Sequence, residues 1–235
     1  MAVSRRSLRV LSRRPLSGSV VELGFTAPLD EPILWKPGQF LTIHGEVGDG
    51  RTINRAYSIL AGRSGGIRLW VEVHSSGVVG PWLAARQVGD EVEVGGPHGG
   101  FGLVPEPIRA QRALFVGEVT GIVPLLSMVC AHHFAPNQVA RLLLLVPSAA
   151  FDLEEATRRE LDGRLNSDSC TFTASPSVTA LPDLLNSEPI LPPPLAGPPG
   201  PDLYLAGSGS LLAAAWDLAT KRGISPARIR QEKFW

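Results

Sequence analysis

Four consecutive residues, Arg-Ala-Tyr-Ser at positions 55–58, combine side chains that suit a flat cofactor with a diphosphate. Arg55 offers a cation with several donors, which a pyrophosphate needs. Tyr57 offers an aromatic plane that can stack on an isoalloxazine ring, and Ser58 offers a hydroxyl for the ring nitrogen that receives hydride or protons. In a strand, Arg55 and Tyr57 share one face and Ser58 takes the other. We predict a flavin site at Arg55, Ala56, Tyr57 and Ser58, although an ordinary half-buried strand is also compatible with these residues.

A glycine-rich turn follows about twenty residues later, in the segment SSGVVGPWLA at 75–84. This turn leads into a short predicted helix, whose first backbone N–H groups can bind a phosphate. We assign the turn and two residues of the preceding strand to the cofactor: Trp70, Val71, Gly77, Val78, Val79 and Gly80.

The second half of the chain contains weaker candidates for binding a nucleotide. A predicted strand ends in the turn Gly117-Glu118-Val119-Thr120-Gly121, and a later strand ends in Ala206-Gly207. Small residues in such turns let a phosphate approach the backbone closely. We predict weak nucleotide binding at Gly117, Thr120, Gly121, Ala206 and Gly207, and we also count Thr120 as a cofactor contact.

The residues through position 95 alternate between short β-rich runs and turns that contain Gly or Pro, with one helical segment near 80–87. Six such runs predict a closed antiparallel β-barrel over residues 1–104. The predicted strands are Leu8–Leu11, Val20–Phe25, Phe40–Gly45, Arg55–Leu60, Ile67–Val73 and Glu91–Val94.

From Ala113 the pattern changes to alternating strands and helices, which predicts a doubly wound parallel α/β domain over residues 109–235. The run LLLLV within 141–146 is typical of a strand that is buried on both faces. The fold class is thus α+β with two domains. The predicted strands are 113–116, 141–146, 170–174, 203–206 and 229–234, and the predicted helices are 122–133, 153–165, 178–186 and 211–222.

Composition excludes several classes of partner and site. Basic and acidic residues balance at 22 each, which argues against nucleic acid. Cys130 and Cys170 have no CxxC spacing, so we expect neither an iron–sulfur cluster nor another metal site, and a reducing cytoplasmic location. No apolar stretch approaches the roughly 20 residues of a membrane-spanning helix, and we expect a soluble protein.

Taken in order along nearly the whole chain, these motifs resemble the ferredoxin–NADP reductase family, in particular its bacterial flavodoxin/ferredoxin reductases. The resemblance implies an FAD-binding barrel followed by a pyridine-nucleotide domain, with FMN as the alternative flavin. The motifs that carry it are PGQF at 37–40, RAYS at 55–58, GVVGPWL at 77–83, TGIVPLLSM at 120–128, LAGSGSLL at 205–212 and EKFW at 232–235.

The resemblance also implies roles for single residues. Arg55 and Ser58 contact the flavin, Tyr57 stacks on it, and the turn at 77–80 lies at its pyrophosphate. The family usually has Ser or Thr where this chain has Gly80, which implies weaker binding there.

The C-terminal tail resembles the family's tail, which often ends in Glu, one residue and an aromatic. This implies that Phe234 or Trp235 covers the flavin and that Glu232 shares a catalytic proton path with Ser58. The alternative is that Phe234 and Trp235 only pack against an edge strand.

The nucleotide-binding half departs from the family pattern. Glu118 and Val119 stand where the family usually has two small residues, and Ala206 replaces its cysteine. The arginines for the 2′-phosphate of NADP align with Ser148 and Pro176, neither of which is a cation. We therefore expect weak use of NADH and NADPH, with no preference for NADPH.

Two functions remain open within the family, and a third lies outside it. The chain is expected to be a flavin-dependent reductase that passes electrons between NAD(P)H and a separate acidic ferredoxin or flavodoxin. The alternatives are an FAD-binding electron-transfer subunit with a degenerate NAD(P) site and a redox-silent scaffold or unrelated chemistry on this fold.

Overall fold

The computed structural model describes residues 5–26, 32–47, 50–62, 66–103, 112–132, 139–145, 151–162, 170–175 and 201–234. Its contacts divide the chain into two compact units, Met1–Gly102 and Leu103–Trp235. The predicted helix 178–186 and the aligned positions Ser148 and Pro176 lie outside the described residues. Within them, no helix is both long enough and apolar enough to cross a membrane.

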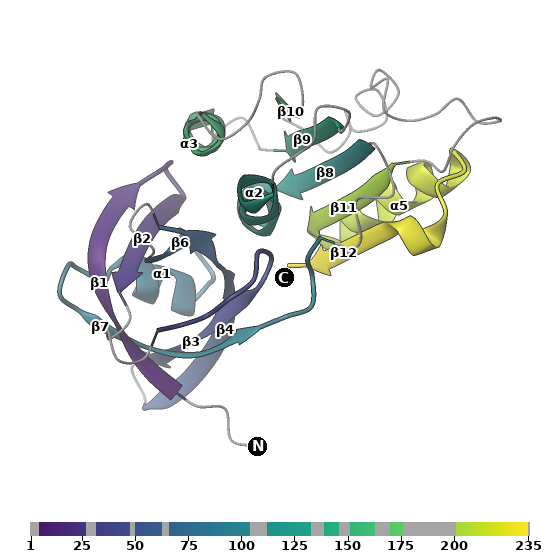
Figure 1. The fold of residues 1–235 in the computed structure, drawn as a ribbon. Helices are drawn as coiled ribbons and strands as arrows, with labels where there is room; N and C mark the ends of the chain where they lie inside the picture. The colour runs from purple at the N-terminus through teal and green to yellow at the C-terminus, as the bar shows by residue number, and fades with distance from the viewer. Residues whose placement is uncertain are drawn as a thin grey trace. The chain divides into compact units, whose positions relative to one another are not determined.

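The first unit is an antiparallel barrel, whose strands curve round in Figure 1. The sheet order is β4-β3-β7-β1-β2-β6-β5, and α1 (Val79–Ala84) packs beside β6 and β3. The strands are β1 (Arg5–Pro15), β2 (Val20–Thr26), β3 (Phe40–Val47), β4 (Arg51–Ser58), β5 (Leu60–Ala61), β6 (Ile67–Glu72) and β7 (Glu91–His98).

The predicted strand Arg55–Leu60 is divided between two strands that lie at opposite ends of the sheet order. Residues of β4 pair with β3, whereas Leu60 and Ala61 of β5 pair with β6, and Ile59 alone separates β4 from β5. One continuous stretch of chain therefore joins the two ends of the sheet. This closure gives seven strands where the sequence pattern predicts six.

The barrel core follows from alternation along each strand. Leu8 and Val10 of β1 are fully buried, while Ser7, Arg9 and Leu11 beside them are exposed. Leu41 and Ile43 of β3 join the same cluster. The alternation ends at Val10, because Leu11–Pro15 are all exposed, and it is pairing with β2 and β7 that extends β1 over Arg5–Pro15.

The second unit is a parallel sheet in the order β10-β9-β8-β11-β12. The strands are β8 (Arg112–Glu118), β9 (Val139–Leu145), β10 (Cys170–Ser175), β11 (Asp202–Gly207) and β12 (Ile229–Lys233). The helices are η1 (Val119–Gly121), α2 (Ile122–Ala131), α3 (Phe151–Leu161), α5 (Gly209–Lys221) and η4 (Pro226–Arg228). The order confirms the predicted doubly wound arrangement, with β8 and β11 at the point where the winding reverses.

Helices cover the sheet through apolar residues on alternate positions of its central strands. Leu114 and Leu203 pack with Leu211 of α5 in one cluster, whereas Phe115 and Tyr204 stack on each other with ring centroids 4.9 Å apart. The helix α2, which is almost entirely buried, packs against β8 and β11. The carboxyl ends of β8 and β11 thus open onto the starts of α2 and α5 (Figure 1).

Candidate functional site

Arg55 and Tyr57 lie on β4, whose hydrogen-bonded neighbour in the described sheet is β3. Arg55 is exposed, and its Nη1 donates to the backbone carbonyl of Asn54 at 2.9 Å. Tyr57 is half-buried and packs against the barrel core. The strand therefore presents a guanidinium and an aromatic ring two residues apart on one face, as a ring-and-diphosphate ligand requires.

Burial raises the pKa of the Tyr57 phenol to about 12, although the nearby charge of Arg55 lowers it slightly. Tyr57 therefore remains a neutral aromatic ring throughout the physiological pH range. A neutral, partly buried ring fits a stacking role rather than proton transfer.

Ser58 ends β4 and is buried, with 8% of its surface exposed, while Ala56 is exposed. Ser58 pairs with Phe40 of β3, and the next N–H, that of Ile59, donates to the Gln39 carbonyl at 2.9 Å. Ser58 is thus held rigidly where the chain passes from β4 to β5. Its contact with a flavin stays a prediction.

The glycine-rich turn leads directly into α1. The N–H of Gly77 donates to the His74 carbonyl at 2.9 Å, Val78 is exposed, and Val79 enters the barrel core. Among the described side chains none caps this helix, so its first N–H groups have no side-chain acceptor. Those groups are suited to an external anion.

Close packing against β6 explains why position 80 is a glycine, which the sequence alone does not reveal. A Cβ at this position would lie 2.7 Å from the Glu72 carbonyl oxygen, closer than real Cβ contacts. Replacing the usual Ser or Thr by glycine therefore lets the first turn of α1 approach β6.

Trp70 and Val71 occupy opposite faces of β6. The indole Nε1 of Trp70 donates to Glu22 Oε2 at 2.9 Å, and Val71 is fully buried in the barrel core. Both side chains are thus engaged within the barrel wall. Their predicted contact with the cofactor stays a prediction.

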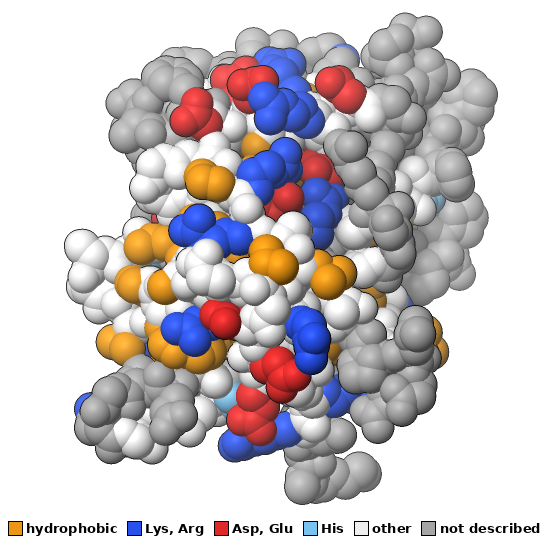
Figure 2. Space-filling model, turned by 90° about the vertical axis from the view of Figure 1, so that its left-hand side faces the viewer, with side chains coloured by type: hydrophobic (Ala, Val, Ile, Leu, Met, Phe, Trp, Pro, Cys, Tyr) orange, Lys and Arg blue, Asp and Glu red, His pale blue; other side chains and the backbone are white. Residues whose placement is uncertain are grey.

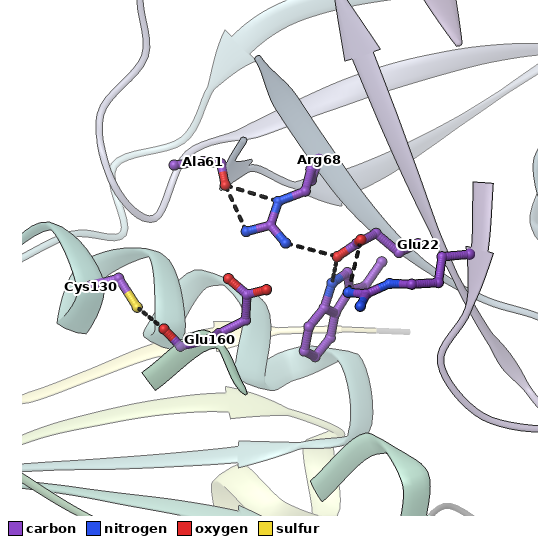
Figure 3. Close-up of polar contacts among 7 residues, drawn as sticks. Glu22, Ala61, Arg68, Cys130 and Glu160 are labelled. Atoms are coloured by element: carbon purple, nitrogen blue, oxygen red, sulfur yellow. Dashed lines mark hydrogen bonds and ion pairs between the residues drawn. The ribbon is translucent and has the colours of Figure 1, made fainter. Parts of the chain in front are cut away.

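Glu22 is a buried carboxylate at the centre of a polar cluster that the sequence analysis missed (Figure 3). It accepts from Arg68 Nη1 and from Arg14 Nη2, both at 3.0 Å, in addition to Trp70. Arg68 also donates to the Ala61 carbonyl from Nε at 2.9 Å and from Nη2 at 2.7 Å. The cluster ties β2, β6 and β5 together at the point of barrel closure.

In the second unit, two predicted glycines permit close backbone contacts at the carboxyl ends of β8 and β11. A Cβ at Gly121 would lie 2.4 Å from the Ala206 carbonyl oxygen, and one at Gly117 would lie 2.7 Å from the Cα of Ile122. Thr120 is buried in the turn between them. The predicted residues Gly117, Thr120, Gly121 and Ala206 are therefore brought together.

The two residues that depart from the family pattern have distinctive geometry. Val119 has a φ of 47°, a left-handed conformation that a β-branched residue rarely adopts. Glu118 Oε2 accepts a hydrogen bond of 2.9 Å from the backbone N–H of Ser208. Ser208 is the N-cap of α5, and its own Oγ accepts from the Leu211 N–H at 3.3 Å. The sequence analysis did not identify Ser208, although its position before an apolar helix is typical of an N-cap.

The C-terminal tail extends β12 alongside β11. Glu232 is in register with Ala206, and the Phe234 N–H donates to the Gly207 carbonyl at 2.9 Å. Burial raises the pKa of Glu232 above its ordinary value. Phe234 is half-buried, and Trp235 lies outside the described residues. A cover over the flavin and a proton path through Glu232 stay predictions.

Several charged side chains on the described barrel surface are paired with side chains of opposite charge. Arg5 pairs with Glu93 and Arg9 with Glu91 across β1 and β7, at 3.2 and 3.5 Å. Figure 2 shows basic, acidic and apolar side chains interspersed on the face it presents. In the described residues, the arginines of β1 therefore do not form a continuous positive patch.

The chain has clear similarity to known flavoprotein reductases. Residues 7–102 match the oxidoreductase FAD-binding domain family. The glycine betaine monooxygenase reductase subunit of Chromohalobacter salexigens is 36% identical over 104 residues, which cover 42% of this chain and 27% of that protein. Ferredoxin–NADP reductase B of Sorangium cellulosum is 27% identical over 239 residues, with 96% of both chains covered.

Other relatives are longer than this chain. NADH–cytochrome b5 reductase 1 of Arabidopsis thaliana is 26% identical over 67% of this chain, and the chain covers 56% of its length. The chain thus spans about a quarter to somewhat more than half of the first relatives it matches.

Solved structures share the fold. The ferredoxin reductase of carbazole 1,9a-dioxygenase superimposes with a TM-score of 0.78 and 19% identity, covering 100% of this chain and 68% of that chain. An Amycolatopsis cytochrome P450 reductase gives 0.75 and 22%, with 100% and 71% covered. The superpositions confirm the two-domain fold, and the match of residues 7–102 to an FAD-binding domain family supports FAD as the cofactor.

Proposed function

We propose that this chain, which is similar to ferredoxin reductase-like FAD-dependent oxidoreductases, passes electrons between a nicotinamide nucleotide and a separate one-electron carrier protein. The observation that carries the proposal is the pairing of Arg55 and Tyr57 on β4 of a barrel that matches FAD-binding domains. When bound, FAD supplies the conversion between two-electron and one-electron transfer.

In this proposal, different residues of the barrel bind different parts of FAD. Arg55 offers charge-assisted donors to the pyrophosphate, and the uncapped first turn of α1 offers backbone N–H groups. Tyr57 offers its neutral ring to the isoalloxazine, and Ser58 offers a hydroxyl. These assignments are part of the proposal, as are the domain boundaries 1–104 and 109–235.

The carrier in this proposal is an acidic ferredoxin or flavodoxin. Several arginines contribute little to attracting this carrier, because carboxylates of the chain already neutralise them. Arg5 and Arg9 are paired with glutamates, and Arg228 is paired with Asp202 at 3.1 Å. Arg230 on β12 remains exposed. We place the docking charge on this exposed end of β12.

A cytoplasmic location belongs to the same proposal. Cys130 is present as a thiol, whose Sγ donates to the Glu160 carbonyl at 3.7 Å (Figure 3). A thiol in this state fits a reducing compartment.

Anaerobic titration of the purified protein with NADH and with NADPH tests the proposed reaction. We expect a yellow protein whose flavin absorbance is bleached by the nucleotide and restored by an added ferredoxin. A colourless protein that takes up no FAD would overturn the proposal.

The strained turn at Val119 favours a second candidate, an FAD-binding electron-transfer subunit that receives electrons by another route. Glu118 and Val119 replace small residues where a pyrophosphate must approach the backbone. The same titration separates the candidates. A flavin that dithionite reduces, but that neither nucleotide reduces, identifies the electron-transfer subunit.

A further inference from the structure

The carboxyl ends of β8 and β11 form the switch point of the parallel sheet, where doubly wound folds bind their ligands. The N-terminus of α5 lies at this point and favours an anion through its exposed N–H groups. Lys233 adds a positive group, because its Nζ lies 3.7 Å from the position of a Cβ built on Gly209, the first residue of α5. The start of α5 and the Lys233 ammonium therefore both favour negative charge at this point.

An anion from the chain itself already lies here. Glu118 Oε2 accepts the backbone N–H of Ser208 at 2.9 Å, directly before the first turn of α5. The carboxylate packs tightly, since a Cβ on Gly207 would lie 2.8 Å from Glu118 Cβ and 3.1 Å from Oε2. Glu118 thus contacts both the last residue of β11 and the cap of α5.

The backbone next to Glu118 is held in an unusual conformation. Val119 has a φ of 47° and is buried, with 7% of its surface exposed. Strain of this kind persists only where the surrounding structure imposes it, and it gathers at binding sites and switch regions. Glu118, whose side chain accepts the Ser208 N–H, is the residue directly before Val119.

We propose that Glu118 is an intramolecular anionic ligand of the α5 N-terminus that competes with the diphosphate of a dinucleotide for the switch point. The inference rests on the proposed function, because it takes this point to be the nucleotide site of the reductase. A diphosphate would have to displace the carboxylate or lie beside a like charge. Glu118 is then the specificity-determining residue that makes the protein a poor user of both NADH and NADPH.

Two substitutions separate the charge of Glu118 from its hydrogen bond. Glu118→Gln keeps an oxygen acceptor for the Ser208 N–H and removes the charge, whereas Glu118→Gly removes both and restores a small residue. The matched control is Glu155→Gln, which removes one negative charge from the exposed face of α3.

The test is calorimetric titration of the purified full-length protein with ADP-ribose, which carries the diphosphate but no nicotinamide. We expect both Glu118 variants to bind ADP-ribose about tenfold or more tightly than the parent, and the Glu155→Gln protein to match the parent within about twofold. Loss of the gain on adding Lys233→Ala to Glu118→Gln would further support an anion site.

Binding by the parent as tight as that of the Glu118 variants would overturn the inference. So would no detectable binding by a folded Glu118 variant at millimolar ADP-ribose, with folding checked by the thermal unfolding midpoint. Because ADP-ribose cannot reduce a flavin, this outcome is independent of the nucleotide titration. If the proposed function is wrong, the nucleotide titration will show a protein that binds no flavin. The ADP-ribose affinities of the parent and the variants can still be compared in that case.

Discussion

Arg55 and Tyr57 show how two side chains on one strand face can serve one cofactor. Arg55 is exposed and has no carboxylate partner among the described residues, while Tyr57 packs against the core. An exposed cation beside a half-buried ring matches a ligand that has an anionic linker and a flat head. Their different burial therefore fits different roles in holding FAD.

Replacing Arg55 by alanine is expected to weaken FAD retention by about 1.5–3 kcal/mol, the usual contribution of a hydrogen bond to a charged group. This corresponds to roughly a 10- to 150-fold rise in Kd, measured by the recovery of flavin fluorescence on dilution. Arg51→Ala on the same exposed strand is the control and should retain FAD like the parent. Equal loss of FAD in both variants would contradict the assignment of Arg55.

Glu232 gives a pH-dependent prediction. Burial raises its pKa above the ordinary value of 4.5, so the folded protein binds this proton more tightly than the unfolded chain. Its favourable contribution is complete below pH 4.5 and is lost as the pH rises through the folded-state pKa. Glu232→Gln should therefore gain unfolding free energy relative to the parent between pH 4 and pH 8, as measured by urea denaturation. A constant difference over that range would count against the buried carboxyl.

At the scale of elements, barrel closure depends on a polar cluster as well as on the apolar core. Ile59 lies between β4 and β5, and Arg68 on β6 holds the Ala61 carbonyl of β5 while it pairs with Glu22 of β2. Because β5 has only two residues, few ladder hydrogen bonds anchor it. The arginine therefore supplies contacts that the short strand lacks.

Removing the buried charge of Glu22 is expected to be costly. Glu22→Gln removes the carboxylate charge of Glu22 from the buried Arg68 guanidinium, and breaking a buried ion pair costs about 3–5 kcal/mol. Glu93→Gln breaks the exposed pair with Arg5 on the same barrel and should cost at most about 1 kcal/mol. Urea denaturation of both variants tests this contrast, and similar losses would show that the cluster contributes no more than a surface pair.

At the scale of the whole molecule, the balanced charge of 22 basic and 22 acidic residues leaves no long-range attraction for an acidic carrier. Association must then depend on local charge. Arg230 is exposed, whereas Arg9 on β1 has Glu91 at 3.5 Å. The two arginines should therefore contribute unequally to docking.

Arg230→Gln is expected to lower the second-order rate of ferredoxin reduction about two- to fivefold at low ionic strength, and the effect should disappear near 0.5 M salt. Arg9→Gln is the matched control and should leave the rate unchanged. Stopped-flow measurements with dithionite-reduced protein report this step without any nicotinamide nucleotide. Equal effects of the two substitutions would contradict the placement of the docking surface at β12.

The sequence by itself determined the two kinds of sheet, because alternation of apolar and polar residues is a local property of each strand. The long apolar run of β9 predicted a strand buried on both faces, and the runs before residue 95 predicted the barrel. The order of the motifs also identified the family. These features are visible without knowing which strands are neighbours.

Tertiary structure alone decided which polar groups meet. The chain divides into two strands at Ile59 because the residues before it pair with β3 and those after it pair with β6. The charge of Arg5 is neutralised because the register of β1 with β7 brings Glu93 close to it. Glu118 and Ser208 are 90 residues apart, so no local pattern could join them. Their hydrogen bond exists because β8 and β11 are neighbours in the sheet, which brings the two strand ends together. In the sequence, Glu118 is only a single departure from the family pattern. The fold places its carboxylate at the start of α5.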